Sequence, residues 1–185
     1  MGGALAYGFM ANLPRAHSFD LAGLRLAPGE GRRLDLAVPI DPFEFGGEHY
    51  PVASTPVPVR VDVSRTIAQG YVLRLRFSAS LEGPCMRCLE SAAPMFEVDA
   101  LEVSQPGEGD ELESPYVVGG VLDVAAWSRD SLALMLPGTL LCRPDCAGLC
   151  PVCGANLNEA SPEHHHDPEP DARWAKLAEL RFDGE

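Results

Sequence analysis

Two groups of cysteines in this 185-residue chain have the spacing of metal ligands. One is the pair in Cys85-Met86-Arg87-Cys88, and the other is a set of four within twelve residues, Cys142, Cys146, Cys150 and Cys153. In a Cys-x-x-Cys segment two thiolates can converge at about 2.3 Å on one ion, and a following glycine such as Gly154 relieves the tight turn. Sets of thiolates favour zinc, so the sequence predicts that the protein binds zinc.

Six thiolates do not divide into sets of four, so two arrangements remain open. In the first, one zinc ion is held by Cys85, Cys88, Cys142 and Cys146, and a second by Cys150, Cys153 and two of the three consecutive histidines His164, His165 and His166. We take His165 and His166 as the predicted pair. In the second arrangement a single site is formed by Cys142, Cys146, Cys150 and Cys153, and Cys85 and Cys88 stay a free pair. If the histidines bind no metal, we expect them to lie in a solvated polar loop. The cofactor prediction is one or two zinc ions.

The N-terminal residues indicate the cellular compartment, which determines whether these thiols stay reduced. The first ten residues are mostly apolar, but no basic segment precedes them and no run reaches the ~18 apolar residues of a membrane span. We therefore expect a cytoplasmic protein without a membrane partner. In that reducing compartment cysteines are more often metal ligands or catalysts than disulfides.

Catalytic motifs are missing from the sequence. A dithiol oxidoreductase would place Cys-x-x-Cys at the start of a helix in a βα unit, whereas Cys85 follows Gly83-Pro84 in a β-rich region. The chain also lacks a phosphate-binding loop, a dinucleotide fingerprint and a nucleophile elbow. The sequence predicts a protein that is not an enzyme and takes no small-molecule substrate, with a thiol redox switch as the remaining alternative.

Hydrophobic periodicity predicts the strands that position the first cysteine pair. Apolar residues recur at every second position in Val57–Arg65 and in Tyr71–Leu81, with Ala68-Gln69-Gly70 as the turn between them. A third run, Pro94–Val103, alternates until Ala100 and then loses its pattern. Earlier strands are expected at Ser18–Leu26 and Arg33–Val38. These runs predict an antiparallel sheet, either open or barrel-like.

A helical period follows the strands and leads into the cysteine cluster. A helix is expected at about Asp123–Leu136, with Asp123 as its N-cap and Pro137 ending it. The predicted fold is therefore α+β. Residues 1–137 would form the antiparallel sheet with one packed helix, and residues 138–185 a zinc-ribbon-like tail that ends in a short helix after Asp171. We expect the two parts to pack as one unit.

The charge of the chain is concentrated in its second half. Residues 1–90 carry nine basic and nine acidic side chains, whereas residues 91–185 carry five basic and eighteen acidic ones, which accounts for the net charge of −13. An acidic surface repels phosphate and attracts basic partners.

Arginines in the first half could nevertheless contact RNA. Alternation places Arg60, Arg74 and Arg76 on one sheet face, with a fourth arginine at the Cys-x-x-Cys turn. The predicted RNA-binding residues are Arg60, Arg74, Arg76 and Arg87. In the alternative interpretation, Glu97 and Asp99 of the third strand pair with these arginines.

Three separated segments, in this order, resemble the YceD family, the large ribosomal RNA subunit accumulation proteins. They are CMRCLE (residues 85–90), DSLALMLP (residues 130–137) and LCRPDCAGLCPVCGANLNE (residues 141–159). The closing HHHDPEPDARWAKLAEL (residues 164–180) resembles actinobacterial members, and the resemblance spans roughly residues 55–182. It implies a non-enzymatic role in ribosome biogenesis, promoting accumulation or processing of 23S ribosomal RNA.

Two kinds of partner are compatible with that role. The arginine face could bind large-subunit rRNA, or the acidic half, residues 91–185, could bind a basic ribosomal protein. The sequence leaves both open.

Overall fold

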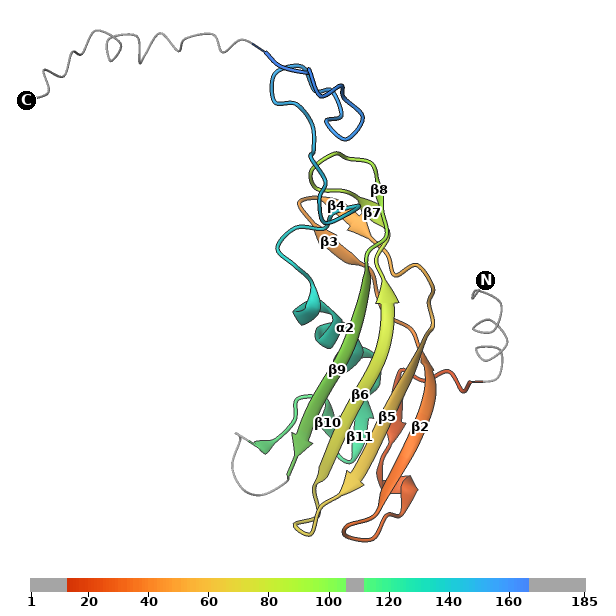
Figure 1. The fold of residues 1–185 in the computed structure, drawn as a ribbon. Coiled ribbons are helices and arrows are strands. Elements are labelled where there is room, and N and C mark those ends of the chain that lie inside the picture. Colours follow the sequence, from red (N-terminus) through yellow and green to blue (C-terminus); the bar gives the residue numbers. More distant parts are fainter. Residues whose placement is uncertain (1–12, 106–111, 167–185) are drawn as a thin grey trace, which may run out of the picture. The chain divides into compact units, whose positions relative to one another are not determined.

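The computed structural model describes residues 13–105 and 112–166 (Figure 1). The chain separates into two compact units, Met1–Cys146 and Ala147–Glu185, and each is described by itself. The helix predicted after Asp171 lies outside the described residues. The predicted division into residues 1–137 and 138–185, packed as one unit, stays a prediction.

Four antiparallel strands form the main sheet of the first unit, in the order β2-β5-β6-β9 (Figure 1). Their bounds are Gly31–Val38 (β2), Val57–Arg65 (β5), Tyr71–Ser80 (β6) and Met95–Ser104 (β9). The alternation predicted for β5 and β6 is confirmed, because Val61, Leu73 and Leu75 are fully buried while Arg60 and Arg74 are exposed. The sheet therefore has an apolar inner face and a charged outer face.

β9 keeps its alternation to its last residue, although its pattern was expected to fail after Ala100. Ser104 is buried, whereas Leu101 is 66% exposed. The register with β6 is the reason, since it places Ala100 opposite the buried Leu75 and Leu101 opposite the outward-facing Arg74. The outer face of β9 therefore carries apolar side chains that no neighbour buries.

A second layer covers the inner face of the main sheet. It consists of helix α2 (Val124–Met135) and a small sheet of β1 (Ser18–Asp20), β11 (Val121–Asp123) and β10 (Val117–Val118). Asp123 caps α2 as predicted, and its carboxylate accepts a hydrogen bond from the Ala126 N–H at 2.9 Å. Trp127 and Leu132 of α2 lie in the same hydrophobic core as the inner face. In the described ranges no helix has the ~20 apolar residues that cross a bilayer.

Two sequence-based expectations about this unit are wrong. The strand expected at Ser18–Leu26 ends at Asp20 and is followed by a 3-10 helix, η1 (Ala22–Leu24). The Asp20 carboxylate accepts from the Gly23 N–H at 3.1 Å, which turns the chain. The barrel-like form is also wrong, because β2 and β9 stand at opposite ends of the strand order and do not pair within the described residues.

Two short hairpins lie beyond one end of the main sheet (Figure 1). They are β3 (Phe43–Phe45) with β4 (Glu48–Tyr50), and β7 (Gly83–Pro84) with β8 (Ser91–Ala92). The Tyr50 hydroxyl donates to the Pro84 carbonyl at 3.0 Å. A Cβ at Gly83 would overlap the Tyr50 ring, so only glycine allows this approach. The contact fixes the hairpin that carries the first cysteine pair.

Candidate metal centres

The loop between β7 and β8 holds Cys85 and Cys88 in a tight turn. The Leu89 N–H donates to the Cys85 carbonyl at 2.9 Å, and the Cys85 N–H donates to the Glu90 carbonyl at 2.7 Å. Leu89 has a positive φ of 63°, a conformation that usually requires glycine. The turn thus presents both cysteines on one side, at the expense of a strained Leu89.

The second half of this centre comes from the segment after α2. The Met86 N–H donates to the Leu140 carbonyl at 2.8 Å, which ties the hairpin loop to that segment. The Arg87 guanidinium donates to the Cys146 carbonyl at 3.0 Å. These bonds bring Cys142 and Cys146 to the pair on the hairpin, although more than fifty residues separate the two in sequence.

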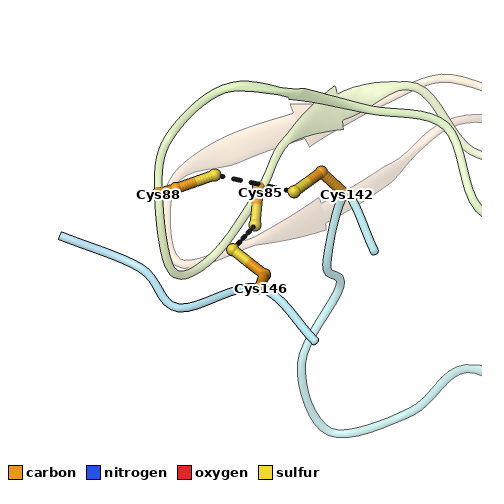
Figure 2. Close-up of side chains that lie close together, drawn as sticks. All are labelled: Cys85, Cys88, Cys142 and Cys146. Carbon is orange, nitrogen blue, oxygen red and sulfur yellow. Dashed lines mark hydrogen bonds between the residues drawn. The ribbon is translucent and has the colours of Figure 1, made fainter. Parts of the chain in front are cut away.

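The four sulfurs lie close enough together to share one metal ion (Figure 2). The Sγ atoms of Cys85 and Cys146 are 3.8 Å apart, those of Cys88 and Cys142 are 3.7 Å apart, and all four lie within 4.8 Å of one another. Ligands on a tetrahedral zinc ion with ~2.3 Å Zn–S bonds are about 3.8 Å apart, whereas disulfide sulfurs are about 2.05 Å apart. None of these four cysteines forms a disulfide bond. We call this set the first centre; its donors fit zinc and leave no coordination position for a substrate.

Charge in the first centre is unevenly stabilised. Burial raises the pKa of Cys85, but the N–H groups of Cys88, Arg87 and Cys142 outweigh it and lower that pKa to about 6. Burial and the neighbouring thiols raise the pKa of Cys142 to about 12. One thiol of the cluster therefore ionises readily, whereas ionisation of Cys142 is disfavoured. Metal ligation requires deprotonated thiols, so a bound cation would be needed to stabilise all four as thiolates.

In the second unit, Cys150–Ala155 repeats the turn of the first pair. The Gly154 N–H donates to the Cys150 carbonyl at 2.8 Å, and the Cys150 N–H donates to the Ala155 carbonyl at 2.8 Å. Gly154 has a positive φ of 73°, as Leu89 does at the matching position. The hydrogen bond to His164, aided by the N–H groups of Cys153 and Val152, lowers the pKa of Cys150 to about 6.

Two histidines complete this second group. Cys153 Sγ lies 3.7 Å from Nε2 of His164 and 3.3 Å from Nε2 of His166, and Cys150 belongs to the same cluster. The predicted pair was His165 and His166, but His165 lies apart, with Nδ1 2.8 Å from the Glu163 carbonyl. Neighbouring side chains of a non-helical segment point to different sides, so alternate histidines converge more easily. Cys150, Cys153, His164 and His166 form what we call the second centre.

Side-chain amides that the sequence interpretation missed organise the second unit. Asn158 Oδ1 accepts from the Ala147 N–H at 2.9 Å, and Asn156 Oδ1 accepts from the Asn158 N–H at 3.0 Å. The Leu157 N–H donates to the Gly148 carbonyl at 2.8 Å. The signal was the Asn-Leu-Asn sequence directly after the cysteine turn, since short amides readily bond to nearby backbone.

The four predicted RNA-binding arginines lie in two places. Arg60, Arg74 and Arg76 project from the outer face of the main sheet, as predicted. Arg87 belongs instead to the first centre, where it bonds to the Cys146 carbonyl.

Each outer-face arginine is paired with a carboxylate. Arg60 bonds to Asp35 at 2.9 Å, Arg74 bonds to both oxygens of Asp99 at 2.7 and 2.6 Å, and Arg76 bonds to Asp62. Asp62 also accepts from Arg33 at 2.7 Å, which is the main cause of its lowered pKa. The pairing considered for Asp99 is present, whereas Glu97 accepts from the Ser78 hydroxyl at 2.8 Å.

Comparison with known proteins finds mycobacterial relatives. An uncharacterized protein of Mycobacterium tuberculosis is 34% identical over 121 residues, which cover 62% of this chain and 58% of the relative, and one of Mycobacterium bovis matches equally. An uncharacterized protein of Mycobacterium leprae is 27% identical over 169 residues, covering 88% of this chain and 76% of the relative. The match thus spans less than two thirds of the first two relatives. No solved structure matches the chain.

A family model also matches the chain. It is described as "Large ribosomal RNA subunit accumulation protein YceD" and matches residues 73–181, which is more than half of the chain. This region contains β9, α2 and all the residues of both centres. The description is that of an accumulation factor and not of an enzyme. The chain therefore belongs to the YceD family.

Proposed function

We propose that this protein is a non-enzymatic cytoplasmic factor that promotes the accumulation of large-subunit ribosomal RNA, and that its two centres bind zinc as structural ions. Family membership over residues 73–181 is the observation that carries the role. The first centre supports a structural function for the metal, because four protein thiolates would saturate the ion. A zinc ion there would cross-link the β7–β8 hairpin to the segment after α2.

The direct test is the level of 23S rRNA in cells that lack the protein. We expect the ratio of 23S to 16S rRNA to fall in a deletion strain and to be restored by the wild-type gene. The Cys142→Ser variant should restore it poorly. A deletion strain with normal 23S rRNA and no precursor accumulation would contradict the proposed function.

We further propose that the outer face contacts rRNA through Arg60, Arg74 and Arg76, with Arg87 contributing from the first centre. Phosphates would have to compete with Asp35, Asp62 and Asp99, but exposed ion pairs of this kind are worth only ~0–1 kcal/mol. Binding of an rRNA fragment should weaken steeply with salt. It should be lost in the Arg74→Glu, Arg76→Glu double variant and kept in Arg25→Glu, an exposed arginine outside this face.

The same ion pairs favour a second candidate, a basic ribosomal protein as the direct partner. They neutralise the outer face, so the unmatched charge of the molecule is the acidic excess of residues 91–185. Crosslinking of the full-length protein in cells separates the two candidates. Adducts between RNA and the outer-face strands support the first, and adducts between residues 91–185 and a basic protein support the second.

A further inference from the structure

One edge of the main sheet has no neighbouring strand among the described residues. β9 pairs with β6 over ten residues, and within the described part of the chain no backbone hydrogen bond reaches its other edge. The first bond beyond the strand joins the Gln105 N–H to the Leu112 carbonyl. The opposite edge, β2, is different, because the Ala37 N–H donates to the Pro14 carbonyl at 2.9 Å. In residues 13–105 and 112–166, the β2 edge is thus bonded at Ala37, and the β9 edge forms no such bond.

The open edge has few of the usual protections against pairing, since its only charged side chains are Glu97, Asp99 and Glu102. Exposed edge strands commonly carry lysine, proline or a bulge. β9 contains neither residue, and its register with β6 is continuous from Met95 to Ser104. Its outer face exposes Met95 by 64%, Leu101 by 66% and, to a lesser extent, Val103. A strand added here would bury apolar side chains as well as form backbone hydrogen bonds.

Helix α2 lies on the other side of this edge strand. The helix contacts β9 from the inner face of the sheet (Figure 1). The apolar surface available to an added strand is therefore that of the outer face, at Met95, Leu101 and Val103.

The charge around β9 indicates which kind of chain segment could bind at this edge. From Cys88 to Gln105 the chain has no lysine, arginine or histidine and four carboxylates, three of them on β9. On β9 itself Asp99 is paired with Arg74, but no ion pair in the described residues involves Glu97 or Glu102. This charge disfavours a second copy of the chain, which would bring the same carboxylates, and it disfavours nucleic acid. It favours an extended segment rich in lysine and arginine.

We propose that β9 binds an extended basic segment of another protein, which adds to the main sheet as a fifth strand. Backbone pairing along the edge gives the affinity, and the basic side chains of one face of the added strand lie beside Glu97 and Asp99, with their aliphatic stems beside Leu101 and Val103. The inference deepens the second proposed function, on which it rests for the partner's place in ribosome assembly.

The experiment uses a synthetic ten-residue peptide in which lysine alternates with valine. Its affinity for the full-length protein is measured by fluorescence anisotropy, and its position by amide chemical shifts of β9. A control peptide keeps every lysine but replaces three valines with proline, which removes N–H donors at constant charge. We expect the control peptide to bind at least about tenfold more weakly.

Two protein variants form a matched pair. Leu101→Lys places a positive charge on the outer face of β9, and Ile67→Lys makes the same change at an 88% exposed position in the β5–β6 turn. Leu101→Lys should weaken binding about tenfold and Ile67→Lys less than about twofold. Val103→Lys is a second edge variant in case Leu101→Lys does not fold.

Three results would overturn the proposal. They are equal binding of the two peptides, which indicates simple charge attraction; equal effects of the two variants; and a dimer in sedimentation that Leu101→Lys dissociates and the peptide does not, which indicates a second copy as the occupant. These outcomes are independent of the rRNA test. A deletion strain with normal 23S rRNA would refute the proposed function and leave the peptide result standing.

Discussion

The two Cys-x-x-Cys turns have the same backbone and opposite surroundings. Cys85 and Cys88 are buried within the first unit, which has a large hydrophobic core, and their turn closes with a strained Leu89. Cys153 and His166 are exposed, and their turn closes with Gly154. Within residues 147–166, Cys150 is the only buried hydrophobic side chain. The comparison teaches that the first centre is attached to a fold with its own core, whereas the second centre takes the place of a core.

Loss of the second centre should have the largest effect. We expect Cys153→Ser to remove one metal ion and to unfold residues 147–166, because a structural zinc ion supplies about 10–16 kcal/mol to a segment that buries almost nothing else. Hydrogen exchange would show loss of protection at Cys150, Gly154 and Leu157 with no change in β5 and β6. Persistent protection of these three amides in the metal-free variant would contradict this prediction.

Loss of the first centre should weaken the first unit without unfolding it. Cys88→Ser leaves three thiols without a complete ligand set, two of them buried, but the core of β5, β6 and α2 remains. We expect the free energy of unfolding to fall by about 2–5 kcal/mol, measured by urea denaturation. Cys153→Ser serves as the control and should leave the transition of this unit unchanged.

The histidines offer a closely matched pair of substitutions. His166→Ala should reduce the metal content by one ion or lower the affinity of the second centre strongly, because His166 Nε2 lies beside Cys153 Sγ. His165→Ala should retain both ions, since His165 faces the Glu163 carbonyl. Loss of an ion in His165→Ala and not in His166→Ala would contradict this and would support His165 as the ligand predicted from the sequence.

Exchanging the residues that close the two turns should give a smaller effect. Gly154→Leu forces a branched side chain into a positive φ and should cost about 1–2 kcal/mol. Leu89→Gly removes that strain but adds freedom to the unfolded chain, so it should change stability by less than about 1 kcal/mol. Thermal melting of both variants checks this, and a large loss in Leu89→Gly would mean that its exposed side chain has a structural contact.

The outer-face ion pairs should give the first unit a small stabilisation that does not depend on metal. The hydrogen bond from Arg33 lowers the pKa of Asp62 in the folded state. The stabilisation of the folded state by ionised Asp62 is therefore present above the ordinary aspartate pKa. It is lost as the pH falls through the lower pKa that Asp62 has in the folded state. Asp62→Asn should be less stable than wild type at pH 6 by no more than about 1 kcal/mol and should approach it near pH 3. Asp41→Asn is the control, and a difference that grows at low pH would refute the prediction.

Local patterns in the sequence were enough to predict the four long strands and the helix, and they reduced the grouping of the cysteines to two arrangements. The alternating valines of β5 and the Asp123 cap of α2 are determined by residues close to them in the sequence. Six thiols can fill two four-ligand sites only if two histidines are added. The open sheet could not be predicted, because closure depends on whether β2 and β9 meet across the whole fold.

The sequence also could not show which of two adjacent residues binds the metal or faces the solvent. His164 and His165 have the same chemistry, and only the path of the backbone decides which ring reaches Cys153. Leu89 gave no signal of its positive φ, since the tertiary contacts of the hairpin impose it. The register of β6 and β9 likewise decided that Leu101 points to solvent, which no alternation in its own segment indicated.

The central claim is that the chain holds two separate structural metal centres, and native mass spectrometry of protein purified without chelators tests it most directly. The account predicts two zinc ions in the wild type, one in Cys142→Ser and one in Cys150→Ser. A single ion in the wild type that is lost from both variants would contradict it, because that result requires one site formed by Cys142, Cys146, Cys150 and Cys153.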